Sequence, residues 1–198
     1  MMNTTMIKSR KDYINYLAKD KRALGIKSNS LEEMIINIIS PNPIWIFQKR
    51  LRRLEYYSNC KNNGVLKLYV YYLKYLFKKT SVKLGFSIPP NVFGPGLAIV
   101  HYGTIVVNIA TEVGENCRMH AGVNIGASGG SKKAPIIGNN VYIGPGAKIY
   151  GDIEIADNCA IGANAVVNKT FLEQSKSIAG VPAKIIGDVD IKSIITHI

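Results

Sequence analysis

The sequence predicts a mainly β fold in which a prism of short parallel strands follows an α-helical region. Two observations predict it: an aliphatic residue returns every six positions in the second half, and the first half spaces its apolar residues as amphipathic helices do. With 198 residues, 47% of them hydrophobic, the chain can bury the core of one or two domains. We expect a basic α-helical domain over 1–88, the strand prism over 89–187 and a C-terminal tail over 188–198.

Four short helices are predicted in the first half. Tyr13, Tyr16 and Leu17 recur at intervals of three and four residues, which places them on one face of a helix. Ser30 and Glu33 form a capping box, a typical helix start. The predicted ranges are 12–24, 31–39, 44–57 and 65–76.

All of the excess positive charge lies in this helical half. Residues 1–88 hold 17 basic and 5 acidic side chains, whereas the 8 basic and 8 acidic side chains of residues 89–198 cancel. We place the basic group Lys49, Arg50, Arg52 and Arg53 on polar helix faces, interleaved with tyrosines. A solvated face is the simplest interpretation, and an anionic membrane surface or a lipid-linked glycan is the main alternative. Nucleic acid is disfavoured, because no helix-turn-helix, RNA-binding or zinc-finger signature is present.

The sequence predicts a cytoplasmic protein, with a peripheral position at the inner membrane face as the alternative. No apolar stretch approaches the roughly 18 residues that span a bilayer, and the first residues lack a signal-peptide pattern. The three cysteines, Cys60, Cys117 and Cys159, are too far apart for a redox or metal pair. We interpret them as reduced and structural.

The six-residue repeat predicts a solenoid with three units to a coil and one inward aliphatic side chain per unit. Asn, Asp and Gly between the units supply the backbone angles that tight corners need. About 95 residues at about 18 per coil give about five coils. Solenoids of this kind expose flat faces, so we expect a trimer, with paired trimers as a further possibility. The repeated aliphatic residues are Ile99, Ile105, Val113, Met119, Ile125, Ile137, Ile143, Ile149, Ile155, Ile161 and Val167.

Two histidines are the candidate acid–base groups. His101 and His120 are 19 residues apart, close to one coil, so we expect them on neighbouring coils near one edge. An imidazole is a natural base for deprotonating a hydroxyl, although a histidine at a coil edge can also simply cap a backbone carbonyl. His197, next to the C-terminus, is expected to be solvated.

Two segments could bind an anionic ligand. The Gly-rich stretch 126–135 interrupts the repeat at Ser131, which predicts an extruded loop with Lys132 and Lys133, or else a solvated one. At the last coil, the stretch 179–187 offers backbone groups and Lys184 to a nucleotide phosphate.

These residues resemble the hexapeptide-repeat acyltransferases, and most closely the serine acetyltransferase branch with its relatives in surface-polysaccharide gene clusters. The resemblance covers residues 88–187 and rests on GLAIVHYGTIVVN, IGPGAKIYG, IGANAVV and AGVPAKI. It implies a left-handed parallel β-helix behind a helical domain, with acetyl-CoA bound as co-substrate in a cleft between adjacent subunits and no metal.

The resemblance also implies roles for individual residues. His101 would be the base that takes the proton of an acceptor hydroxyl, His120 a second polar contact, and a backbone N–H near Gly126 or Ala127 an oxyanion donor. Tyr102 and Lys133 would contact the acceptor. The cofactor would run past Gly126, Ala127, Gly144, Pro145, Gly146 and Ala163 to Val181, Pro182 and Lys184.

Three positions depart from the serine enzymes. Val100 replaces an aspartate, Ala134 a second histidine, and Phe86 the carboxylate that orients the catalytic imidazole. Because the loss of the aspartate and of the second histidine leaves free serine poorly recognised, we expect a sugar or polysaccharide unit as acceptor, with serine as the alternative. A non-catalytic trimeric scaffold is a second alternative. A zinc enzyme of the carbonic-anhydrase type is disfavoured, since zinc needs three protein ligands.

Overall fold

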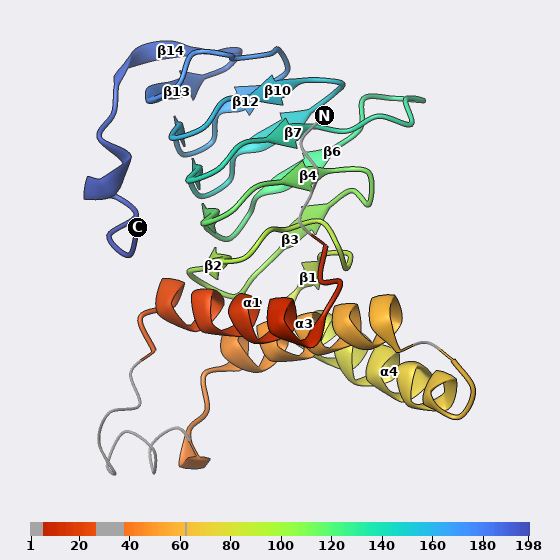
Figure 1. The fold of residues 1–198 in the computed structure, drawn as a ribbon. Helices are drawn as coiled ribbons and strands as arrows, with labels where there is room; N and C mark the ends of the chain where they lie inside the picture. Colours follow the sequence, from red (N-terminus) through yellow and green to blue (C-terminus); the bar gives the residue numbers. More distant parts are fainter. Residues whose placement is uncertain (1–5, 27–37, 62) are drawn as a thin grey trace.

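The computed structural model describes residues 6–26, 38–61 and 63–198, and within them helices come first and strands follow (Figure 1). The helices are α1 (Arg10–Ala23), α3 (Pro43–Cys60) and α4 (Leu66–Leu84). The helix predicted over 31–39, with its capping box, lies largely outside the described residues. In the described ranges no helix is long and apolar enough to cross a membrane.

The helix ends follow local side-chain chemistry. The Ser9 hydroxyl accepts the N–H of Asp12 at the start of α1, and the Asn42 side chain accepts two N–H groups at the start of α3. α4 extends eight residues beyond the predicted end at Leu76. It continues because Thr80 and Ser81 point inward and donate their hydroxyls to carbonyls one turn earlier, which satisfies them inside the helix.

The strands form three parallel sheets that share one axis. The first sheet contains β1 (Phe86–Ser87), β3 (Ile105–Val107), β6 (Asn124–Gly126), β9 (Lys148–Tyr150) and β12 (Val166–Val167). The second contains β4 (Glu112–Val113), β7 (Ile136–Ile137) and β10 (Glu154–Ile155). The third contains β2 (Ala98–Ile99), β5 (Arg118–Met119), β8 (Tyr142–Ile143), β11 (Ala160–Ile161), β13 (Lys176–Gly180) and the antiparallel β14 (Ala183–Asp188).

The repeated aliphatic residues fill the interior, as the six-residue period predicts. Ile99, Met119, Ile143 and Ile161 occupy equivalent positions on successive strands of the third sheet and are fully buried. Cys117 and Cys159 are buried, and all three cysteines are free. The stack of side chains therefore sets the parallel register.

Asparagines stabilise the corner between the second and third sheets. Asn116, Asn140 and Asn158 all have positive φ, between 54° and 60°, where asparagine is tolerated better than most residues. Their side chains form a ladder: the Asn116 amide donates to Asn140 at 2.8 Å, and the Asn140 amide donates to Asn158 at 2.9 Å. Each coil is thus tied to the next at the same corner.

A loop leaves the β-helix between β6 and β7. Lys148 pairs with Val166, 18 residues further on, but Asn124 pairs with Lys148, 24 residues further on. The six extra residues lie within 127–135, where the side chains at the loop tip are exposed and Gly129 and Gly130 have open space around them. The predicted interruption of the repeat is therefore an excursion out of the coil.

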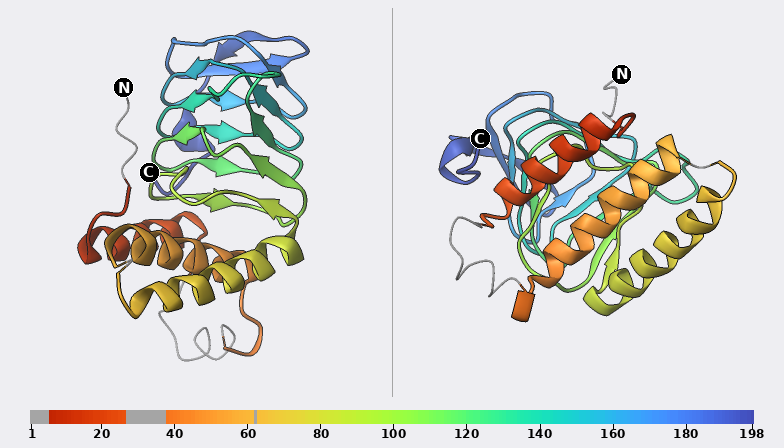
Figure 2. Two further views of the ribbon diagram at one scale, coloured as in Figure 1. Left: turned by 90° about the vertical axis from the view of Figure 1, so that its right-hand side faces the viewer. Right: turned by 60° about the horizontal axis from the view of Figure 1, so that its bottom comes forward.

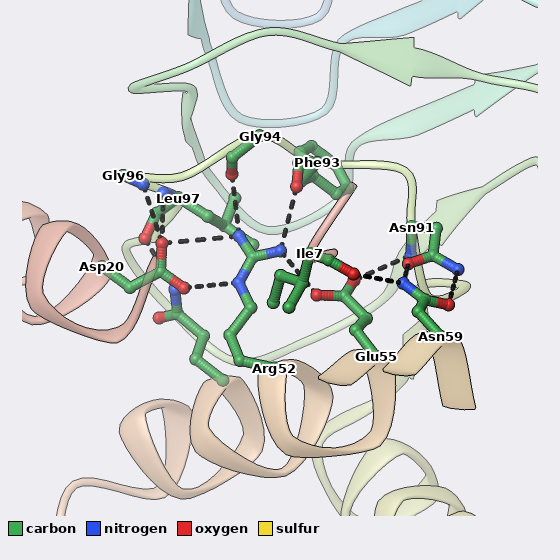
Figure 3. A network of polar contacts seen from close by, with 11 residues as sticks. Ile7, Asp20, Arg52, Glu55, Asn59, Asn91, Phe93, Gly94, Gly96 and Leu97 are labelled. Carbon is green, nitrogen blue, oxygen red and sulfur yellow. Dashed lines mark hydrogen bonds and ion pairs between the residues drawn. The ribbon is translucent and has the colours of Figure 1, made fainter. Parts of the chain in front are cut away.

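The helices form a layer beneath the first coil and are joined to it by a buried polar network (Figures 2 and 3). Arg52 of α3 is fully buried, which corrects its predicted place on a polar helix face. Its guanidinium binds Asp20 of α1 at 2.8 Å and Glu55 at 3.0 Å. It also donates to the carbonyls of Phe93 and Gly94 on the first coil, at 2.9 and 2.8 Å.

The two carboxylates of the network also bind the coil backbone. Asp20 accepts the N–H groups of Gly96 and Leu97, and Glu55 accepts the N–H of Asn91. Burial alone would lower the pKa of Arg52, but the two carboxylates outweigh it and raise the pKa, so the guanidinium stays charged. One hydrophobic core includes Phe47 and Leu51 of α3 and continues into the coils. The β-helix begins with β1, just before the boundary predicted at Pro89.

The C-terminal tail packs along the outside of the third sheet. Ile191 and Ile195 are buried against Ala160 and Tyr142. His197 is half-buried rather than solvated as predicted. Burial first, and the nearby cations Arg22 and Arg118 next, lower the pKa of its imidazole.

Replacing Arg52 should destabilise the fold strongly. We expect Arg52→Met to lower the free energy of unfolding by about 3–5 kcal/mol, because it leaves the buried carboxylates of Asp20 and Glu55 without a cation. Arg53→Met, on the exposed side of the same helix, should cost less than about 1 kcal/mol. Urea titrations of both variants measure the difference. Equal losses of unfolding free energy would contradict the role of Arg52 in joining the helices to the first coil.

Candidate active site

The two candidate histidines lie at one corner of the β-helix, between the third and first sheets. His101 follows β2 and His120 follows β5, and these strands are neighbours in the third sheet. The two ring centroids are 5.9 Å apart. His101 is exposed, whereas His120 is partly buried, and the backbone N–H of His120 donates to the carbonyl of Ile143 on the next coil at 3.2 Å. The repeat therefore brings the two imidazoles together, as their spacing predicts.

His120 is held as a neutral ring at neutral pH. Its pKa is lowered by burial first, then by the positive charge of Arg118, and last by the neighbouring His101 ring. Tyr142 of the next coil packs edge-on against it, with ring centroids 5.4 Å apart. A neutral imidazole has both a donor and an acceptor nitrogen, so it can bind a hydroxyl in either direction.

Tyr142 and Arg118 were missed by the sequence analysis. Each directly precedes an inward aliphatic residue, so each points to the outer surface of the third sheet. The six-residue period could have located both residues. The positions that precede the inward residues of β5 and β8 pair in register, which places Tyr142 above Arg118 and beside His120.

The three departures from the serine enzymes are apolar in the structure as well. Phe86 is buried in β1 and packs edge-on against Phe47. Ala134 is buried at the base of the loop, and Val100 donates its N–H to the carbonyl of Met119. Tyr102, next to His101, is 66% exposed and free to meet a ligand.

The predicted cofactor residues of the upper coils lie along the same corner as the histidines. Gly144, Pro145 and Gly146 follow β8, and Ala163 follows β11. Bonds between backbone groups connect the coils there: Gly146 donates to Ala121, and Asn164 donates to Pro145. A Cβ on Gly144 would lie 2.7 Å from the nitrogen of Ala163, so the coils approach too closely here for a larger residue.

The row of predicted cofactor residues along this corner ends at the turn between β13 and β14, which contains Val181 and Pro182. Val181 is 73% exposed, and Lys184 follows on β14 with its side chain in solvent. β13 pairs with β11, so this turn lies directly beyond Ala163. Four strand spacings of about 4.8 Å separate β2 from β13, so the edge from His101 to the turn is about 19 Å long.

The Gly-rich loop and its base lie at a different corner, between the first and second sheets. Gly126 ends β6, and Ala127 begins the loop. The width of the first sheet, about 10 Å for three residues, separates this corner from His101. Lys133 is exposed and forms an ion pair with Asp152 at 2.7 Å. Within one chain, the loop and His101 therefore do not meet.

The described part of the chain shows no cluster of three or more His, Cys, Asp or Glu side chains that could hold a metal ion.

Comparisons with known proteins agree with the fold. Residues 134–169 match the family model described as bacterial transferase hexapeptide (six repeats). A serine acetyltransferase of Mycobacterium tuberculosis is 40% identical over 111 residues, which are 54% of this chain and 48% of that protein. One from Helicobacter pylori is 38% identical over 105 residues, 52% of this chain and 61% of that protein. The match thus spans only about half to three fifths of these relatives.

Solved structures extend the similarity over nearly the whole chain. A Brucella abortus serine acetyltransferase matches 94% of this chain and 74% of its own with a TM-score of 0.70 at 25% identity. The coenzyme A complex of a serine acetyltransferase from the same organism has a TM-score of 0.69 at 26% identity, over 93% of this chain and 72% of its own. The chain therefore has a helical region ahead of a left-handed parallel β-helix, contains a segment that matches the hexapeptide-repeat transferases, and resembles the serine acetyltransferase branch.

Proposed function

We propose that the protein transfers an acetyl group from acetyl-CoA to the hydroxyl of a small acceptor. The observation that supports this most directly is the juxtaposition of His101 and His120 at the foot of a corner lined by small residues. A relative of the same fold is described as a complex with coenzyme A, which supports acetyl-CoA as the co-substrate. The named relatives favour serine as the acceptor over the sugar expected from the sequence.

In the proposed reaction, His101 removes the proton of the acceptor hydroxyl while the oxygen attacks the thioester carbonyl carbon. The tetrahedral intermediate then collapses and the carbon–sulfur bond breaks. The leaving CoA sulfur receives the proton from the His101 imidazolium, which returns the ring to its neutral form. His120, neutral and next to His101, binds and orients the hydroxyl. Binding both substrates at one corner supplies the proximity that a direct transfer requires.

The site would be completed by a second copy of the chain. The loop over 127–135 lies one sheet width from His101 in its own chain, but a threefold assembly can place one protomer's loop corner against the next protomer's histidine corner. We therefore propose a homotrimer with the acetyl group bound at each seam. An N–H of Gly126 or Ala127 would then stabilise the oxyanion, and Lys133 would face the acceptor.

A sugar hydroxyl is the second candidate acceptor. Val100 and the buried Ala134 offer no charge at two positions where the serine enzymes hold polar groups against free serine. A sugar acceptor needs no such charges. Product analysis by mass spectrometry with acetyl-CoA and either serine or nucleotide-linked sugars distinguishes the two, because only the true acceptor gains the mass of an acetyl group.

Replacing the proposed base should abolish most of the activity. We expect His101→Ala to lower kcat about a hundred- to ten-thousand-fold, because the hydroxyl loses its general base. His197→Asn is the matched control, since it removes a half-buried histidine outside the corner, and it should keep near-normal activity. Thiol release from acetyl-CoA, followed with each acceptor, measures both. Equal rates in His101→Ala and the unmodified protein would reject His101 as the base.

Mixed assemblies test whether the site is shared. Deleting residues 128–133 removes six residues and should return this coil from 24 to 18 residues without disturbing its neighbours. The deletion variant and His101→Ala should each be inactive alone. Random co-assembly should restore about a quarter of the sites, because an intact histidine then meets an intact loop at some seams. No recovery in verified mixed trimers would mean that histidine and loop act within one chain.

The charge on Arg118 should tune the ionisation of His120. Removing it in Arg118→Gln should raise the pKa of His120 towards the ordinary value, although burial, the larger cause, keeps it below. The protonated fraction of His120 at mildly acidic pH should therefore increase, which NMR titration of its ring detects. Lys169→Gln, an exposed charge on a later coil, is the control. An unchanged or lower pKa in Arg118→Gln would contradict this electrostatic assignment.

A further inference from the structure

The outward face of α4 carries a row of apolar side chains that are not among the residues of the proposed active corner, although the end of the helix adjoins the first coil, where the Leu84 carbonyl accepts the N–H of Gly103. Leu68, Tyr71, Tyr72, Tyr75 and Val82 recur at intervals of three, four and seven residues, which places them on one side of the helix. Their exposed fractions lie between 54% and 73%, whereas Val70 and Leu73, on the opposite side, are buried. We call these five exposed residues the α4 stripe. A row of exposed large apolar side chains marks an interaction surface.

Positive charge surrounds the stripe. α4 contains five lysines and no acidic residue: Lys67, Lys74, Lys78, Lys79 and Lys83. Lys79 lies within the stripe, and the other four flank it. The Lys74 ammonium also lies 5.4 Å from the centre of the Tyr71 ring. Cations beside tyrosines and aliphatic side chains on one helix face are the pattern of an interfacial helix.

A basic groove adjoins the C-terminal half of the stripe, between α3 and α4. It has a volume of about 290 Å³, with Pro43, Ile46, Leu76 and Leu84 as apolar lining. Arg50, Lys79 and Lys83 supply its charge. The Arg50 guanidinium is fixed by hydrogen bonds to the Leu76 carbonyl and the Thr80 hydroxyl. An apolar floor with cationic walls matches the chemistry of an anionic lipid, a negative headgroup joined to acyl chains.

We propose that α4 and this groove bind the surface of an anionic lipid bilayer. The charge is complementary: residues 1–88 hold 17 basic and 5 acidic side chains, and a bilayer rich in acidic lipids attracts such a segment. The exposed tyrosines and leucine would lie at the headgroup level, with the lysines against phosphates. Bilayer binding would hold the helical end of the molecule on the membrane and leave the β-helix above it.

The same features disfavour two other occupants. In a twofold contact between copies the lysines of one α4 would face those of the other, and like charges at close range repel. A nucleic acid would satisfy the lysines but would leave Leu68 and Val82 exposed to water. A bilayer with acidic headgroups satisfies both the charged and the apolar parts of the surface.

Vesicle binding tests the proposal with the full-length protein. Co-sedimentation with vesicles of phosphatidylcholine alone should show little binding, whereas equimolar phosphatidylcholine and phosphatidylglycerol should retain most of the protein. Lys79→Gln/Lys83→Gln should weaken partitioning to the anionic vesicles about tenfold. The control Lys169→Gln/Lys192→Gln, which removes two exposed charges outside the helical region, should change it less than about twofold.

The apolar part has its own variant. Leu68→Ser/Tyr72→Ser should keep the folded state, because both side chains are exposed. It should nevertheless bind anionic vesicles more weakly than the unmodified protein, and this difference should persist in about 1 M salt, which screens charges but not apolar contacts. Circular dichroism and acetyl-transfer activity should be unchanged in both α4 variants, so loss of lipid binding is separable from failure of the proposed enzyme.

Three results would overturn the proposal: no binding to anionic vesicles, equal binding to neutral and anionic vesicles, and equal losses in the α4 and control lysine variants. A change of oligomeric state in Leu68→Ser/Tyr72→Ser without lipid, measured by light scattering, would assign the stripe to a second copy instead. Binding to a DNA duplex with no binding to vesicles would assign the lysines to nucleic acid.

Discussion

The inward aliphatic side chain of each six-residue unit is the constraint on which the β-helix depends. Each fully buried Ile or Val contributes about 1.5–3 kcal/mol relative to exposure, and a slip of one residue would turn it towards solvent. The parallel register of Met119 with Ile143, and of Ile143 with Ile161, follows from this burial. Because the register is fixed, the residues that follow these strands stack at one corner, and His101 and His120 meet there.

The attachment of the helices depends on a different kind of interaction. Arg52 is paired with two carboxylates and two backbone carbonyls in a site that excludes water. Such a network specifies one arrangement of α1, α3 and the first coil, since any other would leave buried charges without partners. It holds the basic helices directly below the coil that carries His101, so the proposed catalytic corner and the proposed lipid surface belong to one packed unit.

The repeat made most of the fold predictable, because a period of six is visible in the sequence alone. The inward positions, the loop after Gly126 and the proximity of the two histidines all follow from counting residues. Arg52 could not be placed in this way: its partners Asp20 and Gly94 are 32 and 42 positions away, and helical spacing shows only which side of α3 it occupies. The separation of the loop from His101 likewise appears only when the three sheets are assembled. Tyr142 was predictable in principle, since it precedes an inward isoleucine.

The central claim is that an imidazole of one protomer meets the thioester beside the loop of the next. A crystal structure of the assembled protein with a non-hydrolysable acetyl-CoA analogue tests it most directly. The account predicts the acetyl-mimicking carbon within a few ångströms of the acceptor space in front of His101, the nucleotide near Val181, and loop residues 127–135 from a neighbouring chain closing the cleft. An analogue bound away from that seam, or enclosed by a single chain, would contradict it.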